Sequence, residues 1–261
     1  MTPIRLGAVA YLNARPLVEG LDRDPARFVL RFDAPSRCAA LLDAGGIDLG
    51  MIPSIEYLRG DDYRIVPGVS LASHGPVASV ALFTRRRLGD VRAIATDISS
   101  RTSVGLLRVL CARRFGIEPR LEAMWPDVDA MLARGDAALV IGDAALFLDH
   151  RAAGLHKIDL GEAWTDMTGL PFVWAFWAGR PGAVDGGGMA ALGAARDAGV
   201  AASDAIADAY CGPARAAIGR AYLRENMKYG LGADEWAGLE RYYELAAETG
   251  VAERARPLVF Y

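Results

Sequence analysis

Short apolar runs with strand character alternate with helical patterns over most of this chain. Strands are expected at Ile4–Ala10, Phe28–Phe32, Ile47–Ile52, Val77–Thr84, Val91–Thr96, Ala137–Ile141 and Phe172–Trp177. Helical patterns fill most of the gaps, and residues 189–253 read as nearly continuous helix, broken near residues 212 and 232. This alternation is typical of βαβ units, so it predicts an α/β fold with mostly parallel sheets.

Two of the predicted strands, Val77–Phe83 and Phe172–Trp177, are apolar almost throughout. Strands that are buried on both faces have this composition. If both are crossovers, residues 84–176 form one lobe, and residues 1–83 together with 177–261 form the other, which includes the C-terminal helices. Two lobes joined by two crossover strands make a clamp with a cleft between them. A single, continuous doubly wound sheet is the alternative.

Composition excludes several classes of protein. The formal net charge of −3 over 261 residues argues against a nucleic-acid surface. No apolar run is long enough to span a membrane and no leader pattern precedes the first strand, so we expect a cytoplasmic protein. The three cysteines, Cys38, Cys111 and Cys211, are far apart and lack metal-ligand spacing. We therefore expect free thiols, no disulfide and no metal site.

Ligands of open α/β sheets bind beyond the carboxyl ends of strands, where helix N-termini present free N–H groups. The first such junction carries Asn13, which either caps the helix that Pro16 begins or directs its amide into the cleft. The second carries Ser54, with a hydroxyl and an N–H group, and Glu56 in the first helical turn. Such a glutamate usually complements the helix dipole, and a catalytic role for it is the alternative.

The third junction, Ser99-Ser100-Arg101-Thr102-Ser103, is the most informative. One serine would be enough to cap the helix. Clustered hydroxyls, free N–H groups and one arginine therefore favour a carboxylate-binding site over a simple cap. It is not a nucleotide-binding loop, because GxxxxGK[ST] is absent. At the fourth junction, Gly142 permits close approach of backbone to a ligand, and Asp143 either caps a helix or accepts a ligand hydroxyl.

Two other runs are read as structural. Arg85-Arg86-Arg87 is interpreted as a solvated loop rather than a phosphate site. Residues 182–188, which end in three glycines, are interpreted as a loop by composition.

The junctions also occur in sequence blocks that resemble the chorismate dehydratase family. The blocks are Gly-x-x-x-Tyr-Leu-Asn-Ala-x-Pro-Leu at 7–17, Asp-Leu-Gly-Met-Ile-Pro-Ser-Ile-Glu-Tyr at 48–57, Ser-x-Gly-Pro-Val-Ala-Ser-Val-x-Leu-Phe at 73–83, Ser-Ser-Arg-Thr-Ser at 99–103, Ile-Gly-Asp-Ala-Ala-Leu at 141–146, Asp-Leu-Gly-x-x-Trp-x-x-x-Thr-Gly-Leu-Pro-Phe-Val at 159–173 and Glu-Asn-Met-Lys-Tyr-x-Leu at 225–231. They follow one another in order across most of the chain, which makes them specific together.

The resemblance implies a periplasmic-binding-protein-like fold used as an enzyme. The implied reaction is the elimination of water from chorismate to give 3-[(1-carboxyvinyl)oxy]benzoate, a hydro-lyase step of the futalosine pathway to menaquinone. No metal or organic cofactor is expected, and the small-molecule partner is chorismate, with no nucleic acid and no membrane. The oligomeric state stays open.

Site roles follow from the resemblance as hypotheses. The main carboxylate site is assigned to Ser99, Ser100, Arg101, Thr102 and Ser103. Further binding groups come from Ser54, Gly142 and Asp143. Asn13 is expected to hold the departing hydroxyl or ether region, and Ser79 to add a donor from the crossover strand. The proton acceptor is Glu56, Asp143 or a carboxylate of the substrate itself.

Two rival functions remain at this point. One is the enzyme of the same pathway and fold that releases 1,4-dihydroxy-6-naphthoate, although the Tyr-Leu-Asn and Ser-Arg-Thr-Ser blocks fit the dehydratase better. The other is a non-catalytic module that binds or senses a small carboxylate. No export signal and no helix-turn-helix segment supports that second reading.

Overall fold

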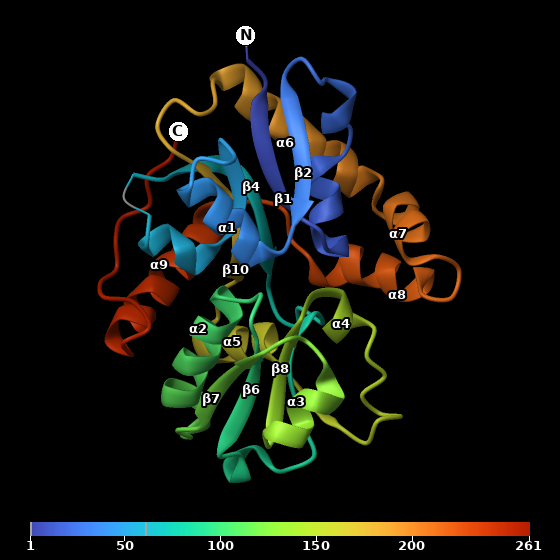
Figure 1. Cartoon of the computed structure of the whole chain (residues 1–261), viewed down its shortest axis with the longest axis vertical. Coiled ribbons are helices and arrows are strands. Elements are labelled where there is room, and N and C mark those ends of the chain that lie inside the picture. Colours follow the sequence, from blue (N-terminus) through green and yellow to red (C-terminus); the bar gives the residue numbers. More distant parts are fainter. Residues whose placement is uncertain (1, 61) are drawn as a thin grey trace.

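The computed structural model describes residues 2–60 and 62–261, so Met1 and Asp61 of the predicted first lobe lie outside the described part. The chain forms two five-stranded sheets, one in each of the two lobes in Figure 1. The first sheet has the order β2-β1-β3-β10-β4, with β1 Ile4–Val9, β2 Phe28–Asp33, β3 Leu49–Pro53, β4 Arg64–Ser73 and β10 Phe172–Gly179. The second has the order β7-β6-β8-β5-β9, with β5 Val80–Thr84, β6 Ala93–Asp97, β7 Arg120–Met124, β8 Ala137–Ile141 and β9 His156–Asp159.

Both sheets are mixed, which corrects the expectation of mostly parallel sheets. β1 pairs in parallel with β2 and β3, whereas β10 runs antiparallel to β3 and β4. The second sheet repeats this pattern, because β6 is parallel to β7 and β8 while β5 is antiparallel to β8 and β9. The antiparallel strands β5 and β10 are those through which the chain enters one lobe and returns to the other.

β5 and β10 are buried along their whole length, as predicted for the two apolar runs. The first run was predicted as a strand from Val77, but the strand begins at Val80, because residues 77–79 belong to the connection between the lobes. Each strand belongs to one sheet, however, since β5 lies in the second and β10 in the first. The chain passes between the lobes in two connections, residues 74–79 before β5 and residues 169–171 before β10. The predicted domain boundaries after residues 83 and 176 lie a few residues beyond these connections.

Short helices cover the two sheets. They are η1 Leu12–Val18, η2 Leu21–Arg23, α1 Pro35–Asp43, η3 Ser54–Leu58, η4 Leu88–Asp90, α2 Thr102–Leu110 with the π-helical turn η5 Cys111–Phe115, α3 Val128–Arg134, α4 Gly142–Leu146 and α5 Leu160–Thr168. None of the helices in the described ranges is long and apolar enough to cross a membrane.

The C-terminal segment returns to the first lobe, where both chain ends lie (Figure 1). It forms α6 Gly186–Ala201, α7 Ser203–Cys211, α8 Ala216–Ala221, the π-helical turn η6 Tyr222–Asn226 and α9 Ala233–Glu248. The prediction of a loop through residue 188 is wrong, because Asp185 accepts a hydrogen bond from the Gly188 N–H group and caps α6. The aromatic rings of Tyr242 and Tyr243 on α9 are fully buried.

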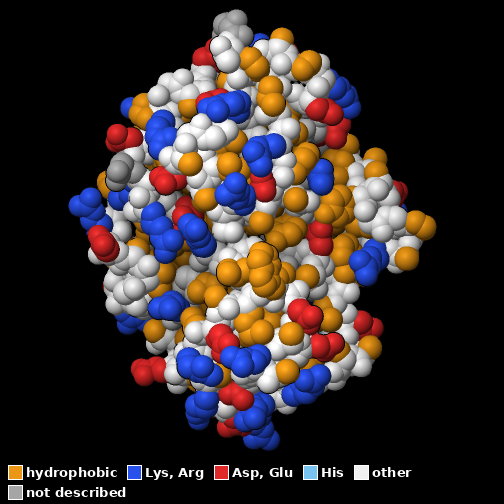
Figure 2. Space-filling model, in the orientation of Figure 1, with side chains coloured by type: hydrophobic (Ala, Val, Ile, Leu, Met, Phe, Trp, Pro, Cys, Tyr) orange, Lys and Arg blue, Asp and Glu red, His pale blue; other side chains and the backbone are white. Residues whose placement is uncertain are grey.

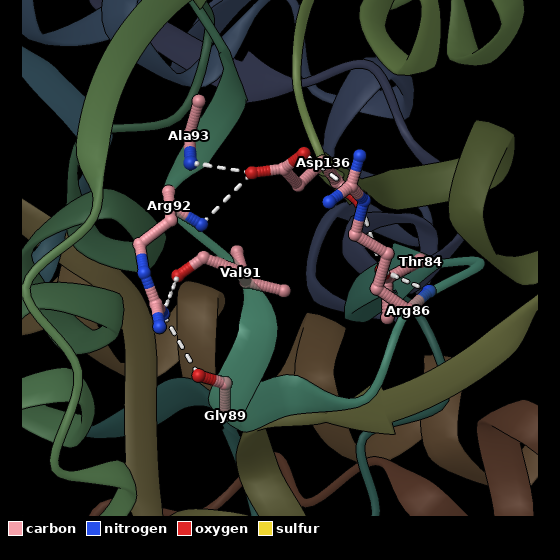
Figure 3. Close-up of polar contacts among 7 residues, drawn as sticks. All are labelled: Thr84, Arg86, Gly89, Val91, Arg92, Ala93 and Asp136. Carbon is pink, nitrogen blue, oxygen red and sulfur yellow. Dashed lines mark hydrogen bonds and ion pairs between the residues drawn. The ribbon is translucent and has the colours of Figure 1, made fainter.

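At the end of the second lobe away from the first, Asp136 joins the start of β6 to the loop that follows β5 (Figure 3). Its carboxylate accepts hydrogen bonds from the N–H groups of Arg92 at 2.9 Å and Ala93 at 3.1 Å, and it pairs with Arg86 at 3.1 Å. Arg85, Arg86 and Arg87 are otherwise exposed. The interpretation of this arginine run as a solvated loop is confirmed.

Candidate active site

A cavity lies between the lobes, lined from the ends of β1, β3 and β8, the first connection, β10 and the start of α2. Figure 2 shows hydrophobic side chains gathered at the waist of the molecule, between the two lobes. The polar or aromatic lining residues are Tyr11, Asn13, Ser79, Ser100, Arg101, Thr102, Ser103 and Trp174. The rest of the wall is made by Val9, Pro35, Pro53, Leu71, Val77, Val80, Ile141, Gly142 and Ala175. This mixture suits a small anion that also carries an apolar ring.

The N-terminus of α2 forms one wall of the cavity. Ser100, Thr102 and Ser103 are buried there, and no side chain caps the helix. The first N–H groups of the helix therefore lack side-chain acceptors, and the partial positive charge at this end favours an anion. Ser100, Arg101, Thr102 and Ser103 thus line one part of the cavity together.

Arg101 is held by a carboxylate from the other lobe. Its Nη1 donates to Glu56 Oε2 at 2.5 Å, while Arg59 Nη1 donates to Glu56 Oε1 at 3.1 Å. Glu56 is buried but does not line the cavity. Because both of its oxygens face guanidinium groups, Glu56 orients Arg101 and is badly placed to take a proton from a ligand. Arg101 has five N–H donors, so others remain for a second carboxylate.

A polar cluster faces the cavity from the first lobe. Ser79 Oγ lies 2.7 Å from the Tyr222 hydroxyl, and both residues are buried. Burial raises the pKa of Tyr222, although hydrogen bonding to Ser79 and Asn13 opposes that rise. Asn13 is within η1 rather than before it, so it does not cap the helix, and its buried Oδ1 has no hydrogen-bond partner. An unpartnered amide oxygen on a cavity wall is a group left available for a ligand.

Tyr11 and Gly142 meet across the cavity. Gly142 has φ of +63°, and a Cβ atom added to it would lie 2.9 Å from the Tyr11 ring. The Tyr11 hydroxyl is 3.4 Å from Ser99 Oγ, which links the lobes at a second point. Glycine is therefore needed at 142 both for its backbone conformation and for close packing.

Asp143 links the lobes instead of facing the cavity. It accepts hydrogen bonds from the Leu12 N–H group at 3.2 Å and from the Tyr210 hydroxyl at 2.5 Å. Burial raises the pKa of Tyr210, and its hydrogen bond to Asp143 raises it further. Asp143 is thus engaged with first-lobe donors.

Ser54 and Ser99 lie beside the cavity without lining it. Ser54 Oγ is 3.5 Å from Thr102 Oγ1, and the Ser54 carbonyl accepts from Tyr243 at 2.7 Å. Ser99 donates through both its N–H group and its hydroxyl to Asp97 Oδ1, at 2.9 and 2.7 Å. Both serines therefore contact residues next to the cavity and help to hold its wall in place.

The structure thus separates the predicted residues into two groups. Those that line the cavity are Asn13, Ser79, Ser100, Arg101, Thr102, Ser103 and Gly142, and those that do not are Ser54, Glu56, Ser99 and Asp143. Sequence reasoning missed Tyr11, Trp174 and Tyr222. Tyr11 lies in the sequence block at 7–17 and Trp174 in the apolar run Phe172–Trp177, so a signal was present for both. No feature of the sequence around Tyr222 indicated a role in the site. Among the described residues, no group of three or more His, Cys, Asp or Glu side chains could hold a metal ion.

The two-lobed architecture is that of periplasmic binding proteins. The structure is similar to a protein of Archaeoglobus fulgidus with a TM-score of 0.77 and 17% identity, over 96% of this chain and 98% of that one. It is also similar to the alkanesulfonate-binding protein SsuA of Xanthomonas axonopodis pv. citri bound to MOPS, with a TM-score of 0.71 and 18% identity over 100% and 96% of the two chains. These likenesses establish a periplasmic-binding-protein-like fold.

Sequence comparison identifies the family. The family described as menaquinone biosynthesis matches residues 4–248, and the chain belongs to it. The chorismate dehydratase of Thermus thermophilus is 30% identical over 208 residues, which cover 69% of this chain and 71% of that protein.

Proposed function

We propose that this protein is a chorismate dehydratase, a hydro-lyase of menaquinone biosynthesis. The observation that carries the proposal is the cavity between the lobes, where the α2 N-terminus and Arg101 face one side and Asn13 and Ser79 another. Chorismate has two carboxylates and an apolar ring, which match these walls. The family match does not favour a sensing module or the 1,4-dihydroxy-6-naphthoate enzyme.

The reaction removes the ring proton beside the ether oxygen and the hydroxyl of the neighbouring carbon, which leave together as water. The product ring is aromatic. The ring carboxylate accepts charge as the proton leaves, so donors around it stabilise the transition state more than the substrate. We assign this binding role to Ser100, Arg101, Thr102 and Ser103, with Ser99 behind them.

Asn13 and Ser79 are proposed to hold the departing hydroxyl. Tyr222 keeps its proton because burial raises its pKa. A Tyr222 hydroxyl that donates to Ser79 Oγ leaves the serine proton free to bond the leaving oxygen. Closure of the lobes excludes water from this step.

The proton acceptor is the remaining assignment. Glu56 is held by two arginines and Asp143 by two first-lobe donors. Of the three acceptors that the sequence left open, only a carboxylate of the substrate remains, and the one not assigned to the α2 donors is the carboxylate beyond the ring. We therefore propose that a carboxylate of chorismate removes the proton, with Glu56 and Asp143 as supports of the closed site.

The test is incubation of the purified protein with chorismate, followed by ultraviolet absorbance and by mass spectrometry for the loss of one water. Asn13→Ala and Ser79→Ala should each lower turnover by about 100- to 1,000-fold, the loss that follows removal of one transition-state hydrogen bond. Ser203→Ala is the matched control, because Ser203 is buried at the start of α7 and donates to the Val200 carbonyl of α6, outside the cavity wall. Binding of chorismate without product would favour the sensing module, and unchanged turnover in both site variants would remove the cavity assignment.

A further inference from the structure

Ala78 has an unusual backbone. It is the one non-glycine residue with positive φ in the described ranges, at +62°. This left-handed conformation is unfavourable for a residue with a Cβ atom, and such strain concentrates at functional sites. Ala78 immediately precedes Ser79, in the connection between β4 and β5. The conformation of residue 78 therefore sets the direction in which Ser79 enters the cavity.

Asp159 holds this conformation from the second lobe. Its Oδ2 accepts from the Ala78 N–H group at 2.7 Å, and its Oδ1 accepts from the Val77 N–H group at 3.0 Å. The same Oδ1 caps α5 through the N–H groups of Gly161 at 2.9 Å and Glu162 at 3.1 Å. The two oxygens thus have different partners: Oδ2 accepts from Ala78, whereas Oδ1 accepts from Val77 and also caps α5.

Lys157 holds the carbonyl side of the same residue, in the next peptide unit. Its Nζ donates to the Ala78 carbonyl at 2.6 Å. Partial burial lowers the pKa of Lys157, and the negative charge of Asp159 opposes that shift. Neither Lys157 nor Asp159 lines the cavity.

Neighbouring residues of the connection are bonded as well. Gly75 donates its N–H group to Thr165 Oγ1 at 2.8 Å, and the Pro76 carbonyl accepts from Asn226 Nδ2 at 2.8 Å. The connection is consequently a fixed support, although a crossover in a clamp would ordinarily be expected to flex.

We propose that Asp159 and Lys157 are positioning residues that hold Ala78 in its left-handed conformation and so present Ser79 to the substrate. This inference rests on the proposed function for its kinetic readout. It predicts that the pair affects the rate of the chemical step more than the binding of chorismate, because Ser79 acts on the leaving hydroxyl while the carboxylates bind elsewhere.

The decisive variant is Asp159→Asn. Its amide oxygen can keep the cap on α5, but its NH₂ group then faces the Ala78 N–H group, so one specific contact is lost. We expect kcat to fall about tenfold with KM changed less than about twofold. Addition of Ala78→Gly should restore most of that loss, because glycine adopts positive φ without the penalty of a Cβ atom. A tenfold recovery corresponds to about 1.4 kcal/mol, the size expected for that penalty.

Two further variants keep the test open to refutation. Lys157→Met should lower kcat in the same way and respond to the same second substitution, which covers the case in which Asp159→Asn does not fold. Asp127→Asn is the matched control, since Asp127 caps α3 through the Ala130 N–H group, outside the cavity wall. A loss of kcat that Ala78→Gly fails to restore, or no loss at all, would overturn the inference.

Hydrogen exchange separates this inference from the proposed function. Amides 77–79 should exchange at least about tenfold faster in Asp159→Asn than in the wild type or in Asp127→Asn, whether or not chorismate is the substrate. A wild-type protein that fails to dehydrate chorismate would refute the proposed function alone. Unchanged exchange at residues 77–79 would refute the positioning role alone.

Discussion

Gly142 offers a sharp test of the cavity because its backbone and its packing can be perturbed separately. Alanine in the left-handed conformation costs about 1–2 kcal/mol. At this position the new Cβ would also lie 2.9 Å from the ring of Tyr11, which must then move. Overpacking of this kind costs about 1–3 kcal/mol more.

Gly116 provides the matched control. It has the same φ of +63°, but a Cβ atom built on it meets nothing within 4 Å. Gly116→Ala therefore has the backbone cost alone. With a shift of about 2–4 °C in Tm for each kcal/mol in a chain near this size, it should lower Tm by about 2–8 °C. Gly142→Ala should lower Tm roughly twice as far.

Turnover distinguishes the two variants more clearly than stability. Displacement of Tyr11 disturbs a cavity wall and its contact with Ser99 across the cleft. A shift near 1 Å in a site can cost about 100-fold in rate, so Gly142→Ala should lose at least about tenfold in kcat/KM for chorismate, while Gly116→Ala keeps it. Equal losses of Tm with unchanged kcat/KM in both proteins would refute the packing of Tyr11 on Gly142.

Three further predictions follow from buried and paired groups. Iodoacetamide should modify Cys211 in the native protein but leave Cys38 and Cys111 unlabelled by mass spectrometry, because burial raises the pKa of these two thiols to about 12 and about 11. Hydrogen bonds from the N–H groups of Arg92 and Ala93 lower the pKa of Asp136 below its ordinary value of 3.8 (Figure 3). The charged carboxylate therefore stabilises the folded protein above pH 3.8, and this stabilisation is lost as the pH falls through the lowered pKa of the folded protein. Asp136→Asn should lower Tm at pH 7 but not near pH 2, with KM unchanged. Burial raises the pKa of Asp97, which makes its charged form unfavourable in the folded protein, so Asp97→Asn should melt at or above the wild-type temperature at pH 7, with the difference narrowing as pH falls toward 4.

The strands that the sequence predicted are apolar runs that contain at most one charged residue each. β4 was missed because Pro67 and Gly68 interrupt it, and an edge strand tolerates proline where a central strand does not. The edge strands β7 and β9 are short and carry charged residues, which exposed edges favour. A strand has an apolar sequence pattern because its side chains are buried, and burial is weakest at the edges of a sheet. The missed strands β4, β7 and β9 are all edge strands.

The candidate site divides in a similar way. The strand-to-helix junctions were visible because strand, polar turn and helix start adjoin in sequence, and the structure brings most of their residues to one cavity. The partners of Ser79 were not visible. Tyr222 is 143 residues away, and Asp159 contacts Ala78 across 81 residues. No local sequence pattern predicts contacts between residues so far apart in the chain. The expected absence of a cofactor and the expected cytoplasmic location stay predictions.

The placement of acidic residues around the cavity bears on the mechanism. Glu56 belongs to the first lobe and bonds Arg101 of the second, whereas Asp143 belongs to the second lobe and bonds the Leu12 N–H group of the first. Each carboxylate thus joins the lobes, and each is neutralised or hydrogen-bonded before a substrate arrives. A cavity that must bind two substrate carboxylates would be weakened by a free carboxylate of its own, because like charges repel. The proposed mechanism avoids this repulsion, because it uses the two acidic side chains to join the lobes and a carboxylate of the substrate as the base.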